Sequence, residues 1–232
     1  MADEIRRSAQ LRLENYDSDK VPHNYLARYD NEFSELVEKP IKLLEMGVYR
    51  GGSLMLWRDY FPAGEIVGID LYPPQNFPSA DRVYIYKGNQ GDMKFLSQVA
   101  HERAPQGFDI IIDDASHMGE LTKIAFWHLF DNHLRPGGIY AIEDWGTGYC
   151  DDWPDGKSLD LKQNETAKIG PKYPWYCHSY GMVGLVKQLI DEQCAADVSR
   201  KLLSGKPNRW SRFESMVITP SIVFIRKAGK SY

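Results

Sequence analysis

The sequence of 232 residues has few cysteines, and their spacing matches neither a disulfide framework nor a structural zinc site. Only three occur, at Cys150, Cys177 and Cys194, with no C-x-x-C or C-x-x-H pattern among them. Disulfide scaffolds and structural zinc sites both need closely patterned ligands. Both classes are therefore disfavoured, and a reducing compartment is expected.

The sequence also lacks an excess of basic residues and any long apolar run. Its formal net charge is -4 and its pI is about 5.9, whereas proteins that neutralise nucleic-acid phosphates usually carry a basic excess on one face. The first 20 residues are polar and charged, and no window approaches the length of a membrane span. We therefore expect a soluble, cytoplasmic protein that acts on a small molecule, with neither nucleic acid nor membrane as partner. A homo-oligomer is left open.

What the sequence does have is enough apolar material, 43% of its residues, for one well-buried α/β core. Short apolar runs bounded by Gly, Asp or Pro predict strands, and the segments between them predict helices. The predicted strands are 41–47, 65–70, 82–88, 108–113 and 137–144, and the predicted helices are 53–61, 92–103 and 119–134, the last followed by an RPGG turn. This alternation predicts right-handed crossovers and a parallel sheet covered on both faces.

The ends of the chain follow other patterns. Residues 1–20 show no clear period and predict an irregular arm. An amphipathic helix follows it, with Tyr29 and Phe33 on its apolar face, and is expected to end before Pro40. Residues 145–178 also show no dominant period but are rich in Trp and Tyr, which is typical of a substrate lid. A helix at 181–194 and a hairpin at 215–227 come last. The expected fold is one doubly wound, Rossmann-like α/β domain over 21–232, with a mostly parallel seven-stranded sheet and a C-terminal antiparallel hairpin.

The first motif is LLEMGVYRGGSLMLW, in which a strand ends near Glu45 and a helix begins near Ser53 after a glycine-bearing turn. Ligands of open parallel sheets bind above the carboxyl ends of the strands. The spacing Gly47-x-x-x-Gly51-Gly52 differs from G-x-G-x-x-G, so a pyrophosphate cradle is poorly supported. Glycines at this turn still let the backbone approach a ligand closely.

The next strand ends at Asp70, 23 residues after Gly47, which is approximately the distance at which Rossmann-like sites place an acid on ribose hydroxyls. Both observations favour a nucleoside cofactor without phosphate, such as S-adenosylmethionine, whose amino-acid part would meet Glu45 or a neighbouring main-chain group. The alternative is a tight strand-to-helix turn with an exposed strand-end carboxylate.

The third strand ends in KGNQGD, where Asn89, Gln90 and Asp92 are candidates to bind an adenine edge. Asn, Gly and Asp are also ordinary turn residues, and Asp92 is a candidate cap for the following helix. Both interpretations stay open here.

The second motif joins FDIIIDDASH to YAIEDW at the ends of the fourth and fifth strands. Adjacent strands lie about 4.8 Å apart, and carboxylates at that spacing repel each other unless a cation lies between them. Oxygen ligands without thiolates favour Mg2+ or Mn2+. We expect Asp114, Glu143 and Asp144 to be the ligands. Because strand residues alternate between faces, Asp113 is expected to line the cofactor pocket or to face the other way.

His117 follows Asp114 by three residues, where it could stand beside a substrate hydroxyl as the general base. The alternative is that Ser116 and the two aspartates cap helix 119–134, with His117 exposed at its start. Weaker candidates for substrate contact come from the lid and from the N-terminal helix: His23, Tyr25, Trp145, Tyr149, Trp175 and His178.

Three stretches carry a family resemblance: LLEMGVYRGGSLMLWRDYFPAGEIVGIDL, FDIIIDDASH and LRPGGIYAIEDW. They resemble class I S-adenosylmethionine- and Mg2+-dependent O-methyltransferases that act on the sugars of macrolides and related natural products, together with the rhamnosyl and cephalosporin-hydroxylase-like members of that group. The resemblance extends from about residue 20 to the C-terminus, and the pairing of Asp-x-x-His with Glu-Asp is fairly specific.

The resemblance implies methyl transfer to a hydroxyl of a sugar or glycosylated natural product. It implies metal ligation by Asp114, Glu143 and Asp144, proton abstraction by His117, and cofactor contacts from Glu45, Gly47, Tyr49, Ser53, Asp70, Gln90 and Asp113. Ala115 stands where the family commonly has Gly, and Trp145 stands where it has Leu or Thr, so the acceptor site is expected to differ at these two positions.

Three alternatives remain. A catechol-type O-methyltransferase would also use Mg2+, since a vicinal diol chelates it. A nicotinamide-dependent oxidoreductase can share the sheet topology, but the missing G-x-G-x-x-G speaks against it. A non-catalytic nucleoside-binding protein would not need the set of Asp114, His117, Glu143 and Asp144.

Overall fold

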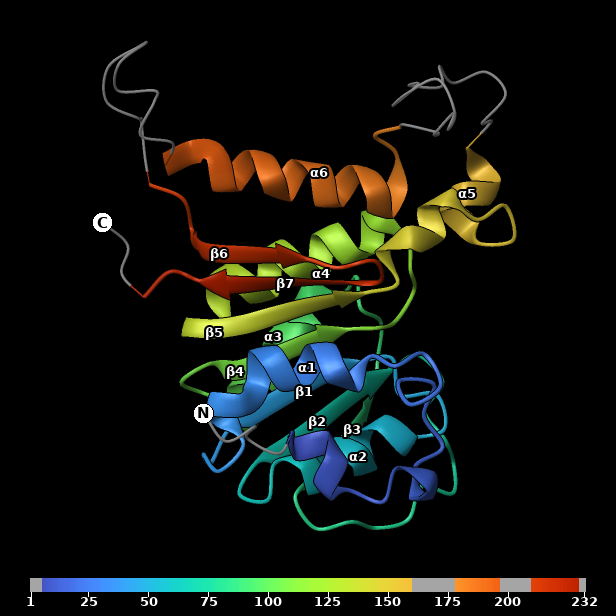
Figure 1. Ribbon diagram of the computed structural model, residues 1–232, viewed down its shortest axis with the longest axis vertical. Coiled ribbons are helices and arrows are strands. Elements are labelled where there is room, and N and C mark those ends of the chain that lie inside the picture. Colours follow the sequence, from blue (N-terminus) through green and yellow to red (C-terminus); the bar gives the residue numbers. More distant parts are fainter. Residues whose placement is uncertain (1–5, 160–177, 197–209, 230–232) are drawn as a thin grey trace.

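A seven-stranded sheet forms the centre of the protein, in the order β3-β2-β1-β4-β5-β7-β6 (Figure 1). The computed structural model describes residues 6–159, 178–196 and 210–229. The first five strands are parallel, and β7 runs antiparallel to both β5 and β6. The predicted fold class, a mostly parallel seven-stranded sheet closed by an antiparallel hairpin, is confirmed.

The strands begin and end close to the predicted positions. They are β1 (Lys42–Met46), β2 (Glu65–Asp70), β3 (Val83–Lys87), β4 (Phe108–Asp113), β5 (Leu134–Glu143), β6 (Phe213–Ile218) and β7 (Ile222–Lys227). The main difference is RPGG, which was predicted to be a turn but lies inside β5. Gly137 has a positive φ of 76° there, and the pairing with β4 shifts register between Phe108 and Ile110. This irregularity lets β5 begin three residues earlier than the apolar pattern indicated.

The helices also follow the sequence pattern. They are α1 (Leu26–Phe33), α2 (Gly52–Tyr60), α3 (Met93–Arg103), α4 (Gly119–Asn132), α5 (Pro154–Ser158) and α6 (Gly181–Gln193). Helix α1 ends earlier than predicted because the chain tightens into a 3-10 helix at Ser34–Leu36. The apolar face stays buried across this change, as Val37 shows.

Two hydrophobic cores lie on the two faces of the sheet. Helices α1 and α2 cover one face, where Tyr29, Phe33 and Trp57 are fully buried. Helices α3, α4 and α6 contribute to the core on the other face, with α6 packed on α4. In Figure 1, α1 and α2 lie in front of the sheet and α3 and α4 behind it. Strand β4 is buried along its whole length, as its apolar sequence predicts.

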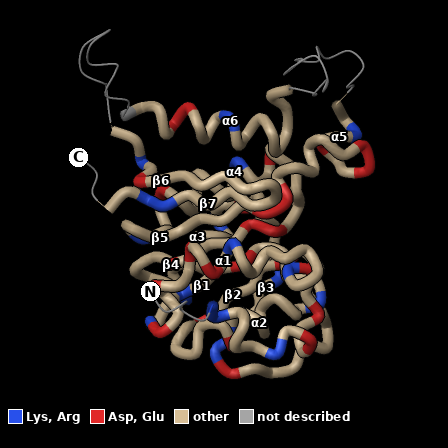
Figure 2. Tube along the Cα trace, viewed as in Figure 1, with Lys and Arg blue, Asp and Glu red and all other residues tan. Residues whose placement is uncertain are grey.

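The predicted arm and lid are partly described. Residues 6–20 contain two short 3-10 helices (Arg7–Gln10 and Leu13–Asn15), and Tyr16 packs against the core that α1 and α2 share. The described part of the lid contains the 3-10 helix Trp145–Tyr149 and helix α5. Among the described helices, none combines the length and the apolar character that a membrane crossing needs. Figure 2 shows acidic and basic residues interspersed along the described elements.

Candidate active site

The candidate site lies at the carboxyl edge of β1, β4 and β5. The sheet order reverses between β1 and β4, because β2 follows on one side and β5 on the other. In open α/β sheets this switch point is where ligands bind. The parallel register pairs Met46 with Asp113 and Asp113 with Ile142, so Glu45, Asp114 and Glu143 come to the same edge. The predicted convergence of carboxylates is therefore confirmed.

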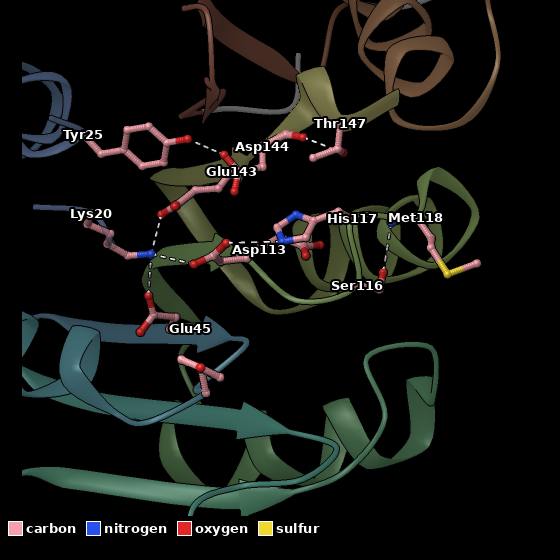
Figure 3. A network of polar contacts seen from close by, with 12 residues as sticks. Lys20, Tyr25, Glu45, Asp113, Ser116, His117, Met118, Glu143, Asp144 and Thr147 are labelled. Carbon is pink, nitrogen blue, oxygen red and sulfur yellow. Dashed lines mark hydrogen bonds and ion pairs between the residues drawn. The ribbon is translucent and has the colours of Figure 1, made fainter. Parts of the chain in front are cut away.

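A lysine from the N-terminal arm occupies the centre of this carboxylate cluster (Figure 3). The Nζ atom of Lys20 lies 2.7 Å from Asp114 Oδ2, 2.8 Å from Glu143 Oε1 and 3.3 Å from Glu45 Oε1. Its side chain is completely buried. Each of the three carboxylates belongs to a different strand end, so one ammonium joins β1, β4 and β5 at the site.

Burial and mutual repulsion set the protonation of these groups. Burial raises the pKa of Glu143 well above its usual range, and the neighbouring Asp114 adds to this. Burial likewise raises the pKa values of Glu45 and Asp114, although Lys20 counteracts the rise in both. Burial alone would lower the pKa of Lys20, but the three carboxylates together raise it well above its ordinary range. The ammonium is therefore charged at neutral pH.

A second cluster shares Asp114 with the first one. Asp114 Oδ1 lies 3.8 Å from His117 Nε2, and ligand atoms of Asp114, His117 and Asp144 all lie within 4.8 Å of one another. The Tyr25 hydroxyl donates a hydrogen bond to Asp144 Oδ1. Asp114 is thus placed between Lys20 on one side and His117 with Asp144 on the other.

These donors fit a divalent ion on the His117 side of Asp114. Two carboxylates with no thiolate nearby suit Mg2+ or Mn2+ when water and substrate oxygens complete the shell, and the imidazole stands beside them. The group of Glu45, Asp114 and Glu143 has the same close spacing, but its centre already contains the Lys20 ammonium. The predicted ligands Asp114, Glu143 and Asp144 are therefore close together, with Glu143 on the lysine side.

Backbone strain concentrates at this site. Among the described non-glycine residues, five have a positive φ, and three of these are the predicted site residues Tyr49, His117 and Asp144. Such conformations cost about 1–3 kcal/mol each and cluster at functional sites. The backbone oxygen of Asp144 accepts hydrogen bonds from the amide and the hydroxyl of Thr147, which fixes the chain after β5.

The capping interpretation of DDASH does not describe the structure. Helix α4 begins at Gly119, and Met118 at its cap makes no side-chain capping bond. The Gly119 amide instead donates to Asp155 of the lid at 2.8 Å. His117 is 9% exposed rather than free at a helix start, and its ring meets Trp153 edge to face at 4.8 Å.

The turn after β1 is tied to the end of β2, as the first motif suggested. Asp70 accepts hydrogen bonds from the backbone amides of Val48 and Tyr49, at 2.7 and 3.0 Å, and from that of Tyr72 at 2.7 Å. Gly47 has a φ of 94°, and a Cβ atom there would lie 2.0 Å from the backbone oxygen of Asp114. The Tyr49 side chain is exposed. A role of Gly47, Tyr49 or Asp70 in cofactor binding stays a prediction.

Two further predicted cofactor residues, Glu45 and Ser53, bind each other. The Ser53 hydroxyl donates to Glu45 Oε2 at 2.7 Å, and the Trp57 indole donates to Glu45 Oε1 at 3.1 Å. With Lys20 also on Oε1, both carboxylate oxygens have partners inside the protein. A direct cofactor contact of either residue stays a prediction.

Asp113 and Asp114 face different surroundings, as the strand alternation predicted. Asp113 accepts hydrogen bonds from the Gln90 amide at 2.8 Å and from the Tyr140 hydroxyl at 3.2 Å. Burial raises the pKa of Asp113 to about 7, although these bonds oppose the rise. Gln90 also accepts from the Ser116 amide, so it links the turn after β3 to DDASH.

The remaining residues of KGNQGD have local roles. Asn89 accepts a hydrogen bond from the Gly91 amide at 2.8 Å, which is an Asx turn. Asp92 caps α3 by accepting from the amides of Lys94 and Phe95. These contacts match the turn and cap interpretations of the sequence. An adenine contact from Asn89 stays a prediction.

Among the substrate candidates that the structure describes, Tyr25 contacts the cluster. Tyr25 reaches Asp144, whereas His23 is exposed and its ring lies near that of Tyr25. Trp145 donates to the Thr219 carbonyl in the β6–β7 turn. Tyr149 and His178 pack against each other at 4.7 Å. Trp175 lies outside the described residues, as does most of the predicted lid.

Sequence reasoning missed two residues of the site. Lys20 lies in a stretch without periodicity, so no pattern pointed to it. Tyr29 was expected only as a core residue of the amphipathic helix, but its hydroxyl donates a hydrogen bond to Glu143 Oε1. A buried tyrosine hydroxyl usually has a partner, and that rule is the one signal that could have indicated a polar role for Tyr29.

The sheet order, the C-terminal hairpin and the polar switch point define the class I, Rossmann-like methyltransferase fold. No family model matches the chain. The chain is 36% identical over 177 residues to 8-demethyl-8-(2-methoxy-alpha-L-rhamnosyl)-tetracenomycin-C 3'-O-methyltransferase of Streptomyces olivaceus, covering 73% of this chain and 40% of that protein. It is 33% identical over 195 residues to mycinamicin VI 2''-O-methyltransferase of Micromonospora griseorubida, covering 81% of this chain and 42% of that protein.

A solved structure agrees with these relatives. The MycE methyltransferase from the mycinamycin biosynthetic pathway, in complex with Mg, SAH and mycinamycin VI, superimposes with a TM-score of 0.66 and 30% identity, covering 88% of this chain and 48% of that one. The expected resemblance to sugar O-methyltransferases is therefore confirmed. The chain spans about two fifths of the length of the two curated relatives, at 40% and 42%.

Proposed function

We propose that this chain is an S-adenosylmethionine- and Mg2+-dependent O-methyltransferase that acts on a hydroxyl of a sugar or glycosylated natural product. Support for the substrate class comes from the relatives, whose names specify O-methylation of a rhamnosyl tetracenomycin and of mycinamicin VI. Support for the cofactor and the metal comes from the MycE complex, which contains Mg and SAH.

The observation that carries the proposal is the position of His117 beside Asp114 and Asp144 at the switch point of the sheet. Asp114 and Asp144 would hold the ion, with Glu143 next to them. When bound, the ion would lower the proton affinity of the acceptor hydroxyl and orient it. The Gly47 turn, Asp70 and the Gln90–Asp113 pair would surround the cofactor on the neighbouring side of β1 and β4.

In the proposed reaction, the acceptor oxygen forms a bond to the methyl carbon as the bond from that carbon to the sulfonium breaks. The hydroxyl proton moves to His117 Nε2, and the products are a methyl ether and S-adenosylhomocysteine. Asp114 Oδ1, 3.8 Å away, stabilises the charge that the imidazole gains. Holding oxygen and methyl carbon in near-attack geometry supplies a large part of the rate, and the Trp153 ring against His117 limits solvent access.

The compartment and the assembly are part of the same proposal. The free thiols of Cys150 and Cys194 fit a reducing environment, and we place the reaction in the cytoplasm. A homo-oligomer is compatible with the proposal but is not required by it.

The test is a methyl-transfer screen against glycosides and catechols, read by product mass, with the variants His117→Ala and His128→Ala in parallel. We expect methylated glycosides that disappear when EDTA is added. His117→Ala should lower turnover by about 10²–10⁴-fold, the usual contribution of a general base, and should leave S-adenosylmethionine binding nearly intact. His128 hydrogen-bonds Ser97 on α3, outside the site, so its variant should retain activity.

Three results would contradict the proposal. Unchanged turnover of His117→Ala would remove His117 from the base role. Calorimetric binding of NAD in place of S-adenosylmethionine would favour the oxidoreductase alternative. Methylation of catechols alone would move the substrate class from sugars to aromatic diols.

A further inference from the structure

Helices α4 and α6 begin without a capping bond from the residue that precedes each of them. The first amides of a helix have no acceptor inside the helix and need another partner. The amide of Gly119, at the start of α4, donates to Asp155 Oδ2 at 2.8 Å, and the amide of Met182, in the first turn of α6, donates to the same atom at 2.7 Å. One carboxylate oxygen therefore caps two helices.

The two helices meet closely around this carboxylate, which is 6% exposed. A Cβ atom at Gly119 would lie 2.1 Å from the carbonyl carbon of Gly181, and a Cβ atom at Gly181 would lie 2.2 Å from Asp155 Oδ2. The two glycines thus leave the space that the oxygen occupies between the helix ends. A carboxylate suits this position, because the positive ends of two helix dipoles meet there.

Asp155 belongs to α5, the helix of the described part of the lid, which lies beside the start of α6 (Figure 1). Trp153, two residues before Asp155, meets the His117 ring edge to face at 4.8 Å. His117 itself lies two residues before Gly119, in a left-handed conformation with a φ of 50°. Asp155 Oδ2 therefore connects the two partners of this ring contact, Trp153 through α5 and His117 through the start of α4.

We propose that Asp155 is a positioning residue that holds α5 on the first turns of α4 and α6 and thereby sets the orientation of the His117 ring. Its carboxylate acts through the backbone, because it fixes where α4 begins and so keeps the left-handed turn at His117 against Trp153. The inference rests on the proposed function, since the orientation of this ring affects the reaction only if His117 is the base.

The test is the NMR signal of the His117 Cε1–H group in protein with 13C-labelled histidine, recorded at about pH 9, where imidazole rings are neutral. The chain has six histidines, and the His117 signal is the one missing from His117→Ala. Trp153→Leu shows where this signal lies without the ring current of the indole. We expect Asp155→Ala to move the signal most of the way to that position, because the loss of both amide bonds separates α5 from the start of α4.

Two further variants separate the contact from a general loss of stability. Both amides donate to a single oxygen, so the side-chain carbonyl of Asp155→Asn can accept both, and its His117 signal should stay near the wild-type position. The matched control is Asp109→Ala, which removes another buried carboxylate, 5% exposed, that accepts the Lys42 amide at 2.8 Å near the start of β4. This control should lower stability and leave the His117 signal in place.

Kinetics provide the second measurement. Asp155→Ala should lower kcat of methyl transfer by about 10–100-fold, since misplacement by about 1 Å can cost about 100-fold in rate. The Kd of S-adenosylmethionine should stay near its wild-type value, because Asp155 acts on the orientation of His117. Asp109→Ala, assayed below its Tm, should change neither quantity.

Hydrogen exchange of the wild-type protein decides the question if Asp155→Ala does not fold. When α5 leaves the helix ends, the amides of Gly119 and Met182 lose their shared acceptor in the same event. Both amides should therefore open with the same free energy and the same dependence on urea. Fast exchange at Gly119 while Met182 stays protected would overturn the inference.

Four other outcomes would also overturn it. They are an unmoved His117 signal in Asp155→Ala, an equally displaced signal in Asp109→Ala, a signal in Asp155→Asn as displaced as in Asp155→Ala, and an unchanged kcat in Asp155→Ala. Each would show that the bridging oxygen does not set the orientation of His117 for the reaction.

Failure of the proposed function gives a different result, because the NMR measurement needs neither methyl donor nor metal. A displaced His117 signal in Asp155→Ala, with no methyl transfer by wild type, would refute the proposed function and support the contact through which Asp155 orients His117. Methyl transfer that depends on His117, with an unmoved signal in Asp155→Ala, would refute the role of Asp155 alone.

Discussion

The Tyr29 hydroxyl can be removed from the site without changing the ring that carries it. Its ring is fully buried and packs against Phe33, Trp57 and Phe224, and its hydroxyl donates to Glu143 Oε1. Tyr29→Phe removes one oxygen and keeps these ring contacts. The expected effect is therefore the loss of one hydrogen bond to a buried carboxylate.

The magnitude follows from that contact. Leaving a buried acceptor without its donor costs about 1–3 kcal/mol, and Glu143 is 1% exposed, so water does not replace the hydroxyl without rearrangement. We expect the free energy of unfolding to fall by about 2 kcal/mol. For a domain of this size, 1 kcal/mol corresponds to about 2–4 °C, so Tm should fall by about 4–8 °C. Lys20 remains bound to the same oxygen at 2.8 Å and limits the loss.

The assay is a double-mutant cycle with Glu143→Gln, measured by urea denaturation at fixed pH. If the hydroxyl acts through Glu143, the two substitutions should be coupled by about 1 kcal/mol or more. Tyr60→Phe is the control, because the buried Tyr60 hydroxyl donates to Asp30 at 2.8 Å, outside the site. Tyr60→Phe should destabilise by a similar amount and add independently to Glu143→Gln. Additivity in the Tyr29 cycle would refute the reasoning.

Two further predictions concern stability. Gly47→Ala should lower the free energy of unfolding by about 3 kcal/mol or more, from left-handed strain and overpacking on Asp114. Gly137→Ala, which also has positive φ but nothing within 4 Å of the added Cβ, should cost only about 1–2 kcal/mol; equal losses would contradict the steric argument. Burial lowers the pKa of His133 from 6.5 to about 4. As pH falls, the unfolded chain therefore takes up this proton at a higher pH than the folded protein does. The free energy of unfolding should fall as pH drops from 6.5 to 4. In a plot of the free energy of unfolding against pH, measured by urea denaturation, His133→Asn should reduce this fall by about 1 kcal/mol. Solvent near the ring keeps the effect below that of a fully buried histidine. An unchanged fall in the variant would exclude His133 as its source.

The strands and the polar edge were predictable because one physical pattern specifies both. A strand buried on both faces reads as a continuous apolar run, as in FDIIID, and it must end where the polar residues begin. The alternation of side chains then separates Asp113, which faces Gln90 and Tyr140, from Asp114, which faces Lys20. Both features follow from local sequence and strand geometry.

The contacts from the N-terminal region could not be predicted in this way. Lys20 and Asp114 are separated by 94 positions, and a lysine in an aperiodic segment has no pattern that indicates burial. The internal bonds of Glu45 to Ser53 and Trp57 were missed for a related reason, since their spacing also fits a helix that simply faces a ligand. Long-range polar partners depend on how the helices and the arm pack, which periodicity does not report.

The partners of the carboxylates show that the arm and the first helix belong to the site. Lys20 contacts Asp114 and Glu143, Tyr29 contacts Glu143, and Tyr25 contacts Asp144. Residues 20–29 thus bind the ends of both β4 and β5, which carry all the proposed metal ligands. Because buried carboxyl oxygens need hydrogen-bond or ion-pair partners, these contacts decide where the oxygens point. The chemistry proposed for DDASH and IED therefore depends on a short segment that the sequence places almost one hundred residues earlier.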